Sequence, residues 1–423
     1  MKITKMSLVA ALLVGSSAFA IDNVKVSGDA KLYYSTEDAT GTDANRAGNT
    51  DAYLFGEASS AGQAAASISI SADLTEGVSA GSKVTALTTL GLQGQLVSNV
   101  WEGTNGVTDS FIVNDLWIAA TAGKTTVKVG RMELDTPLVF TEKWSIVENT
   151  FEAAVVINQD IPDTTLVGAY VGGSNGQLLG ATANPAPVGI ANVVQGTTGE
   201  STFNQFYNGA YAIGAINNSW APLTAQAWYF DAKTDIDLGG NTLLNVNAYW
   251  LQADLNMEGI LAGAQYTGMT FRTAAATIDS SAYAVMLGYE MKDVVTAKIA
   301  YSGIGEDHAA GMNLAGSGQS KLYTEAWWNY GYVTAADTTT YNLTVVGTVA
   351  AVDLGLYYTN ATQNVANADD NTMSEITLSA SKTFGPLDTS LVYINTDASN
   401  QNLDTNGDSS AYNTIQAYLT YNF

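Results

Sequence analysis

A short segment of the chain gathers the charged side chains that are best placed to act on a solute. Four carboxylates stand there against a single lysine, and an arginine precedes them. A carboxylate held partly away from bulk water acts on a nearby ion more strongly than it would in bulk water. The alternative is structural, with Arg131 and Asp135 pairing to fix the segment to its surroundings. The candidate site consists of Arg131, Glu133, Asp135, Glu142, Lys143 and Glu148.

Few other residues have the types or the spacing for catalysis. The chain has no cysteine, and His308 is its only histidine, which excludes thiol chemistry, histidine-based catalysis and multi-histidine metal sites. No pair of carboxylates stands out for glycoside hydrolysis. The stretch Asp404-x-Asn406-x-Asp408 has the opening rhythm of a calcium loop, but Ile415 occupies the position of its final glutamate. We therefore predict no enzyme activity, no cofactor and no metal site, and leave open an incidental calcium ion.

The charge and composition narrow the class of protein further. A net formal charge of −24 argues against nucleic acid as a partner, because one polyanion repels another. Apolar residues make up 46% of the chain, and aromatic residues occur throughout, so the acidity does not indicate disorder.

The first twenty residues have the three-part layout of a bacterial secretory signal. Lys2 and Lys5 begin it, an apolar run follows from Met6 to Val14, and Ala18-Phe19-Ala20 ends it. This apolar run is too short to cross a bilayer as a helix. We therefore predict a signal peptide at 1–20 and a single exported domain at 21–423.

The rest of the chain alternates apolar and polar residues with the period of a β-strand. One such segment places Tyr283, Val285, Leu287 and Tyr289 on the same face. Short and long connections alternate between the segments, which is typical of a transmembrane barrel with brief periplasmic turns and extended outer loops. The fold class we predict is all-β, an antiparallel up-and-down barrel of about 18 strands, with 16 as the alternative.

A barrel of this size leaves room for a water-filled lumen without a hydrophobic core. Small residues that the alternation places inside, such as Ala284, Gly288 and Gly355, favour an open passage. The segment from Lys321 to Tyr332 is assigned to a long loop, in which Trp327 and Trp328 are expected to be an exposed or interface anchor, or to bind a sugar.

The last segment of the chain has a pronounced apolar face. Leu419, Tyr421 and Phe423 alternate with polar residues up to the final position. A closing strand that ends in an aromatic residue resembles the signal by which outer-membrane barrels are recognised for insertion.

One region resembles a known family. The core Gly130 to Pro137 and the stretch Asn149 to Glu152 are similar to the third-loop region of OprD-type outer-membrane porins, and equally to the related major porins of epsilon-class proteobacteria. The likeness extends from Phe111 to Val171; elsewhere only length, strand rhythm and the two chain ends agree.

The resemblance implies an 18-strand barrel, usually a homotrimer, whose third loop folds into the lumen to form a pore constriction. The chain is then expected to be a passive channel of the Gram-negative outer membrane, exported through the periplasm. Its partners would be the lipid bilayer, small hydrophilic solutes and ions, with a mild preference for cations because acids dominate the loop. The alternative is a surface adhesin or structural barrel with an occluded lumen.

Overall fold

The computed structural model describes residues 22–39, 53–56, 59–88, 110–143, 146–175, 209–237, 242–315, 318–366, 368–404 and 406–423. The predicted signal peptide lies outside these residues. Within the described part, no helix is long and apolar enough to cross a membrane.

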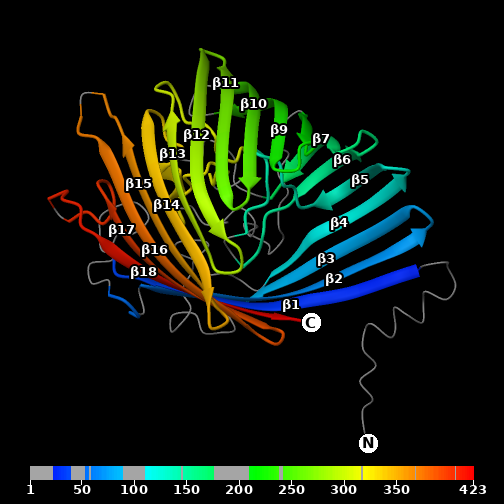
Figure 1. Ribbon diagram of the computed structural model, residues 1–423, viewed down its shortest axis with the longest axis horizontal. Helices are drawn as coiled ribbons and strands as arrows, with labels where there is room; N and C mark the ends of the chain where they lie inside the picture. Colours follow the sequence, from blue (N-terminus) through cyan, green and yellow to red (C-terminus); the bar gives the residue numbers. More distant parts are fainter. Residues whose placement is uncertain are drawn as a thin grey trace, which may run out of the picture.

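Eighteen antiparallel strands form one closed sheet (Figure 1). The predicted strand number is confirmed. The strands are β1 (Asp22–Glu37), β2 (Ser60–Thr75), β3 (Val78–Thr88), β4 (Ser110–Ala122), β5 (Thr125–Met132), β6 (Phe151–Asn158), β7 (Thr164–Ser174), β8 (Ala210–Asn217), β9 (Leu223–Asp237), β10 (Thr242–Met257), β11 (Ile260–Thr273), β12 (Thr277–Met291), β13 (Val295–Ile304), β14 (Thr338–Val349), β15 (Val352–Gln363), β16 (Asn371–Phe384), β17 (Leu387–Ala398) and β18 (Tyr412–Asn422). A 3-10 helix, η2 (Tyr330–Tyr332), lies in the connection between β13 and β14.

Each strand pairs with its neighbours in chain order, and β1 closes the ring by pairing with β18. The final residue takes part in this closure. The backbone N–H of Gly28 donates to the carbonyl of Phe423 (2.7 Å), and the N–H of Phe423 donates back to Gly28 (2.9 Å). A Cβ atom on Gly28 would lie 2.5 Å from the Phe423 ring, so glycine is what allows the ring to rest on β1.

The two ends of the barrel differ in the length of their connections. Eight turns at one end, from the β2–β3 turn to the β16–β17 turn, are only two to five residues long, as the sequence predicts. Left-handed residues such as Glu258 and Ala350 make these reversals tight. The other end carries the long connections, except at 238–241 and 274–276, which are short.

The alternation along each strand separates an outer from an inner face. In β12 the outward Tyr283, Val285 and Leu287 are exposed, whereas the inward Ala282 and Ala284 are completely buried. The predicted face of β12 is therefore confirmed, but its inward alanines do not leave open space. They pack beneath loops that fold into the barrel, in a hydrophobic core that the sequence analysis did not expect.

Candidate pore constriction

The connection between β5 and β6 enters the barrel as a tight hairpin. Asp135 and Phe140 form an isolated antiparallel bridge, and Thr141 donates its backbone N–H to Leu134 (2.8 Å). The Thr136 hydroxyl donates to the carbonyl of Val139 (2.7 Å) and closes the tip. We call residues 134–141 the hairpin. Its position inside the ring confirms that the third loop is folded into the lumen.

Apolar side chains hold the hairpin against the wall. Leu134 and Leu138 pack in one hydrophobic cluster with Trp228 of β9 and Trp250 of β10. Leu138 is fully buried, which stabilises the docked hairpin by roughly 1.5–3 kcal/mol relative to a solvent-exposed leucine. Both indole N–H groups are satisfied by neighbouring glutamines, so these tryptophans belong to the packed wall.

The far end of the same connection reaches a different part of the wall. Ile146 and Val147 are buried in a second cluster with Tyr33 of β1, Leu87 of β3 and Ile112 of β4. The first end rests on β9 and β10. The connection therefore extends across the lumen, because its two ends pack on separate strands of the ring.

A second long connection, residues 305–337 between β13 and β14, also folds inward. Met312, Leu314 and Leu322 join the cluster that contains the hairpin leucines. Its backbone is fixed to the wall by side chains, since Gln265 of β11 donates to the carbonyl of Lys321 (2.8 Å). We call its described residues, 305–315 and 318–337, the inner loop.

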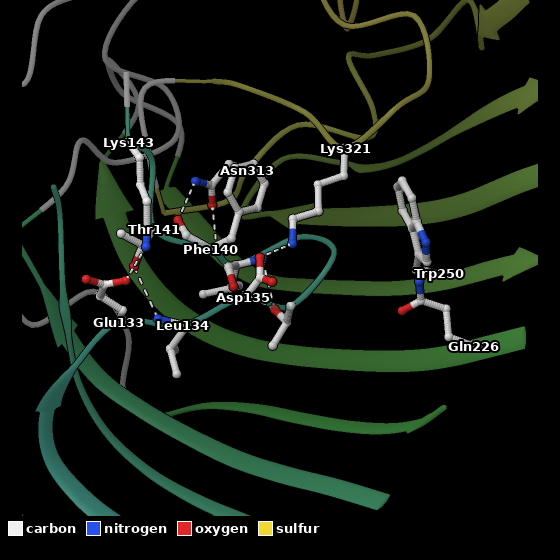
Figure 2. A network of polar contacts seen from close by, with 12 residues as sticks. Glu133, Leu134, Asp135, Phe140, Thr141, Lys143, Gln226, Trp250, Asn313 and Lys321 are labelled. Atoms are coloured by element: carbon white, nitrogen blue, oxygen red, sulfur yellow. Dashed lines mark hydrogen bonds and ion pairs between the residues drawn. The ribbon is translucent and has the colours of Figure 1, made fainter. Parts of the chain in front are cut away.

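Asn313 joins the inner loop to the hairpin (Figure 2). Its Nδ2 donates to the Phe140 carbonyl (2.8 Å) and to Glu142 Oε1 (3.0 Å), and its Oδ1 accepts from the Phe140 N–H (3.3 Å). The N–H of Leu314 adds a bond to the carbonyl of Leu138 (2.8 Å). Asn313 is only 1% exposed, so water does not compete for these contacts.

Two ion pairs surround this junction (Figure 2). Lys321 pairs with Asp135 and also lies over the Phe140 ring, 5.0 Å from its centroid. Lys143 pairs with Glu133 at 2.5 Å. Two of the predicted acids are therefore partly neutralised, one of them by a lysine from the inner loop.

Glu148 lies between two lysines of the opposite wall. Lys83 of β3 donates to its carboxylate, and Lys31 of β1 lies 3.6 Å away. Burial works to raise the pKa of Glu148, but the two lysines outweigh it and hold the pKa below its ordinary value. This carboxylate is ionised at neutral pH, and its charge is balanced by the wall.

Three further carboxyl groups lie where the inner loop meets hairpin and wall. Glu375 of β16 accepts the backbone N–H groups of Trp327 (2.7 Å) and Asn329 (2.8 Å). Glu325 accepts the N–H and the hydroxyl of Ser320. Burial raises the pKa of Glu325 well above its ordinary value, although the hydrogen bonds from Ser320 oppose the rise. The third is the buried Glu142, which Asn313 contacts.

Arg131 lies apart from the other predicted site residues. Its Nε donates to Glu152 of β6 at 3.0 Å. Arg131 shares its face of β5 with the exposed Val127 and Val129, which face outward, and the register places it opposite Glu152. The structure therefore places five of the six candidates inside the ring, four around the hairpin and Glu148 against the lysines of β1 and β3, and directs Arg131 to the outer surface.

Directly before Arg131, the backbone of β5 at Gly130 approaches β4 closely. Its φ is +127°, and a Cβ atom would lie 2.1 Å from the Leu116 carbonyl oxygen. Only glycine fits this close approach of β5 to β4.

The inner loop contributes two residues to this junction that the sequence did not indicate, Asn313 and Lys321. Its content of apolar and aromatic residues, including Leu322, Tyr330 and Val333, is the signal that could have revealed it, because an exposed loop would not carry so many. Trp327 and Trp328, expected as an exposed anchor, are half-buried inside the ring, and Trp327 packs against Tyr357 (5.0 Å between ring centroids).

The Asp404 carboxylate accepts hydrogen bonds from the backbone of its own loop. The Asp404 carboxylate accepts the backbone N–H groups of Asn406 (2.7 Å) and Asp408 (3.0 Å), which hold its pKa below the ordinary value. Among the described residues, no three acidic or histidine side chains gather into a group that could hold a metal ion.

These features define the class of fold, a closed 18-stranded antiparallel barrel narrowed by two infolded connections. No protein-family model and no curated protein sequence matches the chain. Solved structures do. OccK3 (OpdO) of Pseudomonas aeruginosa matches with a TM-score of 0.68 and 13% identity, covering 95% of this chain and 96% of that one.

Two further structures give the same result. Pseudomonas aeruginosa OpdK, solved with vanillate, matches with a TM-score of 0.69 and 12% identity over 95% of this chain and 98% of that one. Acinetobacter baumannii OccAB4 matches with a TM-score of 0.66 and 12% identity over 94% and 98%. At these identities the likeness establishes the shared fold.

Proposed function

We propose that this protein is an outer-membrane porin of the OprD type, a passive channel for small hydrophilic solutes and ions. The observation that carries the proposal is that the inner wall of the barrel has an apolar part and a polar part. The two infolded connections pack on the apolar part, whereas strand residues and one turn around β12–β16 line a hollow of about 360 Å³. Thr296, Tyr357, Ser379 and Ser381 are among its polar residues, so this part of the lumen suits water and hydrophilic solutes.

The test is electrical. Purified protein added to a planar bilayer is expected to produce stepwise conductance that is linear in voltage. Folding is checked separately by the change in gel mobility on heating, which folded barrels show. Folded protein that stays silent over repeated trials contradicts the channel.

We further propose a mild preference for cations. The chain is strongly acidic, and Glu142 adds a buried carboxyl group where the hairpin meets the inner loop. Pairing limits the effect, because Glu133, Asp135 and Glu148 each contact a lysine. Of the other bases that could oppose it, the alternation places Lys128 and Lys298 inside, and Lys382 outside.

Two substitutions at one ion pair test the selectivity. Lys83→Met leaves Glu148 with Lys31 alone, and is expected to shift the reversal potential in a salt gradient toward cations. Glu148→Gln removes the acid shared by both lysines and leaves Lys31 with Asp29 (3.8 Å), and is expected to shift the reversal potential toward anions. Equal reversal potentials for both variants and the wild type contradict a passage lined by this group, and a wild type that prefers chloride contradicts the cation preference.

A surface adhesin or structural barrel is the second candidate. The observation in its favour is that the hairpin and the inner loop fill part of the ring and pack as a hydrophobic core. Binding by the outer connections in a protein that conducts no ions would support it.

The proposed location adds three expectations. The segment 1–20 would direct export through the periplasm, and three copies would associate in the membrane. Leu419, Tyr421 and Phe423, which are exposed on the outer face, would serve as the insertion signal. A kinship with epsilon-class porins remains a prediction.

A further inference from the structure

Tyrosines form a continuous row on the outer face of half the barrel. Each of the nine consecutive strands from β7 to β15 contributes one, and the register places each tyrosine opposite the next or two residues away from that position. Neighbouring rings lie close together, as for Tyr301 and Tyr341 (4.9 Å between centroids). We call this row the tyrosine belt. It consists of Tyr170, Tyr211, Tyr229, Tyr249, Tyr266, Tyr283, Tyr301, Tyr341 and Tyr358.

Such aromatic girdles mark the level of lipid headgroups on membrane barrels. The belt therefore identifies an outer surface that is built to face lipid over β7–β15.

The belt is interrupted over β2–β6. The register continues Tyr170 of β7 into Ala154 of β6 and Val129 of β5. From the other side, it continues Tyr34 of β1 into Gly62 of β2. Phe111 of β4 is the one aromatic residue that points outward among the described side chains of these five strands.

The same five strands also carry charge on their outer face, where Arg131 of β5 pairs with Glu152 of β6 (3.0 Å). Charged groups are costly against lipid, and the cost rises with depth.

The outer surface of these strands has both a hollow and projecting apolar side chains. At the β2 edge of this face, Ala64, Ala66 and Ala86 line an almost entirely apolar hollow of about 400 Å³ together with residues of β1, β17 and β18. Beside it, Phe111 is 74% exposed and Leu116 is 58% exposed on β4. Small residues let protein surfaces approach closely in a membrane, where large apolar side chains gain by filling a matching hollow.

We infer that the outer face of β2–β6 is covered by a second copy of this chain, with Phe111 and Leu116 of one copy seated over the alanine hollow of the next. A copy is the fitting occupant because the face carries both the projecting and the hollow half of the contact, and both signs of charge. Contacts between unlike patches repeat around a closed ring, which is the geometry of a cyclic oligomer. The inference deepens the proposed association in the membrane and rests on the proposed membrane location.

The absence of cysteine from the chain gives a clean test. Two single variants, Ala66→Cys and Leu116→Cys, are co-expressed with tags of different size, so that a disulfide between them can only join two chains. The matched pair is Leu251→Cys and Val285→Cys, whose side chains are 48% and 49% exposed within the belt region. Oxidation in isolated outer membranes is followed by denaturing electrophoresis.

The expected result is a mixed-tag dimer for the β2–β6 pair and monomer for the belt pair. Monomer for both pairs, equal linking of both pairs, or linking of the β2–β6 pair to a product of another mass overturns the inference. Lipid occupancy gives the first of these outcomes, and a different protein gives the last.

A second variant tests the hollow itself. Ala66→Trp fills the space that Phe111 or Leu116 of the next copy would occupy, and is expected to cause loss of oligomer in native mass measurements. The conductance of each barrel should stay unchanged, which separates this inference from the channel proposal. Retention of the oligomer by a folded Ala66→Trp protein contradicts the contact.

Discussion

Removal of the Asn313 side chain should release the hairpin from the inner loop. Three of its hydrogen bonds cross between the two, and Asn313→Ala leaves the N–H and carbonyl of Phe140 and one oxygen of Glu142 without these partners. At about 1 kcal/mol for each bond, the docked hairpin loses about 3 kcal/mol. That loss raises the population of released hairpin roughly a hundredfold.

The remaining contacts are too weak to cancel this effect. The Asp135 side chain is 91% exposed, so its ion pair with Lys321 is screened by solvent. Leu138 still favours docking, and the variant is expected to exchange between docked and released states instead of losing its structure.

Single-channel recording should detect the exchange as a noisier and larger mean conductance. The matched control is Asn364→Ala, which removes one hydrogen bond to Asp337 (2.7 Å) from an exposed asparagine. A conductance and noise in Asn313→Ala that equal those of the control would refute the claim that Asn313 holds the hairpin in the passage.

Three more variants test separate parts of the argument. Gly130→Ala is expected to block folding, because its Cβ atom would lie 2.1 Å from the Leu116 carbonyl oxygen, and the heat-modifiable gel band should disappear. Burial favours the protonated form of Glu325 and so raises its pKa. The protonated carboxyl therefore stabilises the fold fully below the ordinary carboxyl pKa of about 4.3, and this contribution is lost as the pH rises through the raised pKa. Glu325→Gln should therefore unfold at a higher temperature than wild type at pH 8 and at the same temperature at pH 4, and a destabilised variant at pH 8 would contradict the assignment. Gly28→Leu should displace the Phe423 ring and slow barrel closure, seen as a longer half-time of refolding into detergent micelles. The matched change Gly168→Leu, at a glycine without positive φ where a Cβ atom meets nothing within 4 Å, should leave the half-time unchanged.

The sequence predicts the ring well because strand alternation is a local property. The outward face of β12 and the eight short turns follow from residues that are adjacent in the chain. The same rule already indicates where Arg131 points, since it has the parity of Val127 and Val129, yet its position beside the acids favoured the constriction. The clustering of charges along the chain therefore predicted the direction of Arg131 less well than the strand alternation did.

The interior is harder to predict because its contacts join distant segments. Glu148 is balanced by Lys31 and Lys83, and only the strand register brings these lysines to the loop. Ala284 alternates as a lumen-facing residue should, but whether water or a loop covers it depends on the path of the inner loop. Composition alone does not determine that path.

The core inside the ring constrains the order in which this protein can assemble. Phe140 and Asn313 are 173 positions apart, so the hairpin lacks its partner in the inner loop until the chain beyond β13 has arrived. If β1 paired with β18 while the inner loop stayed outside the ring, Trp250 and Met269 would remain exposed to water. The core inside the ring can therefore be completed only after the inner loop has been synthesised and has entered the ring.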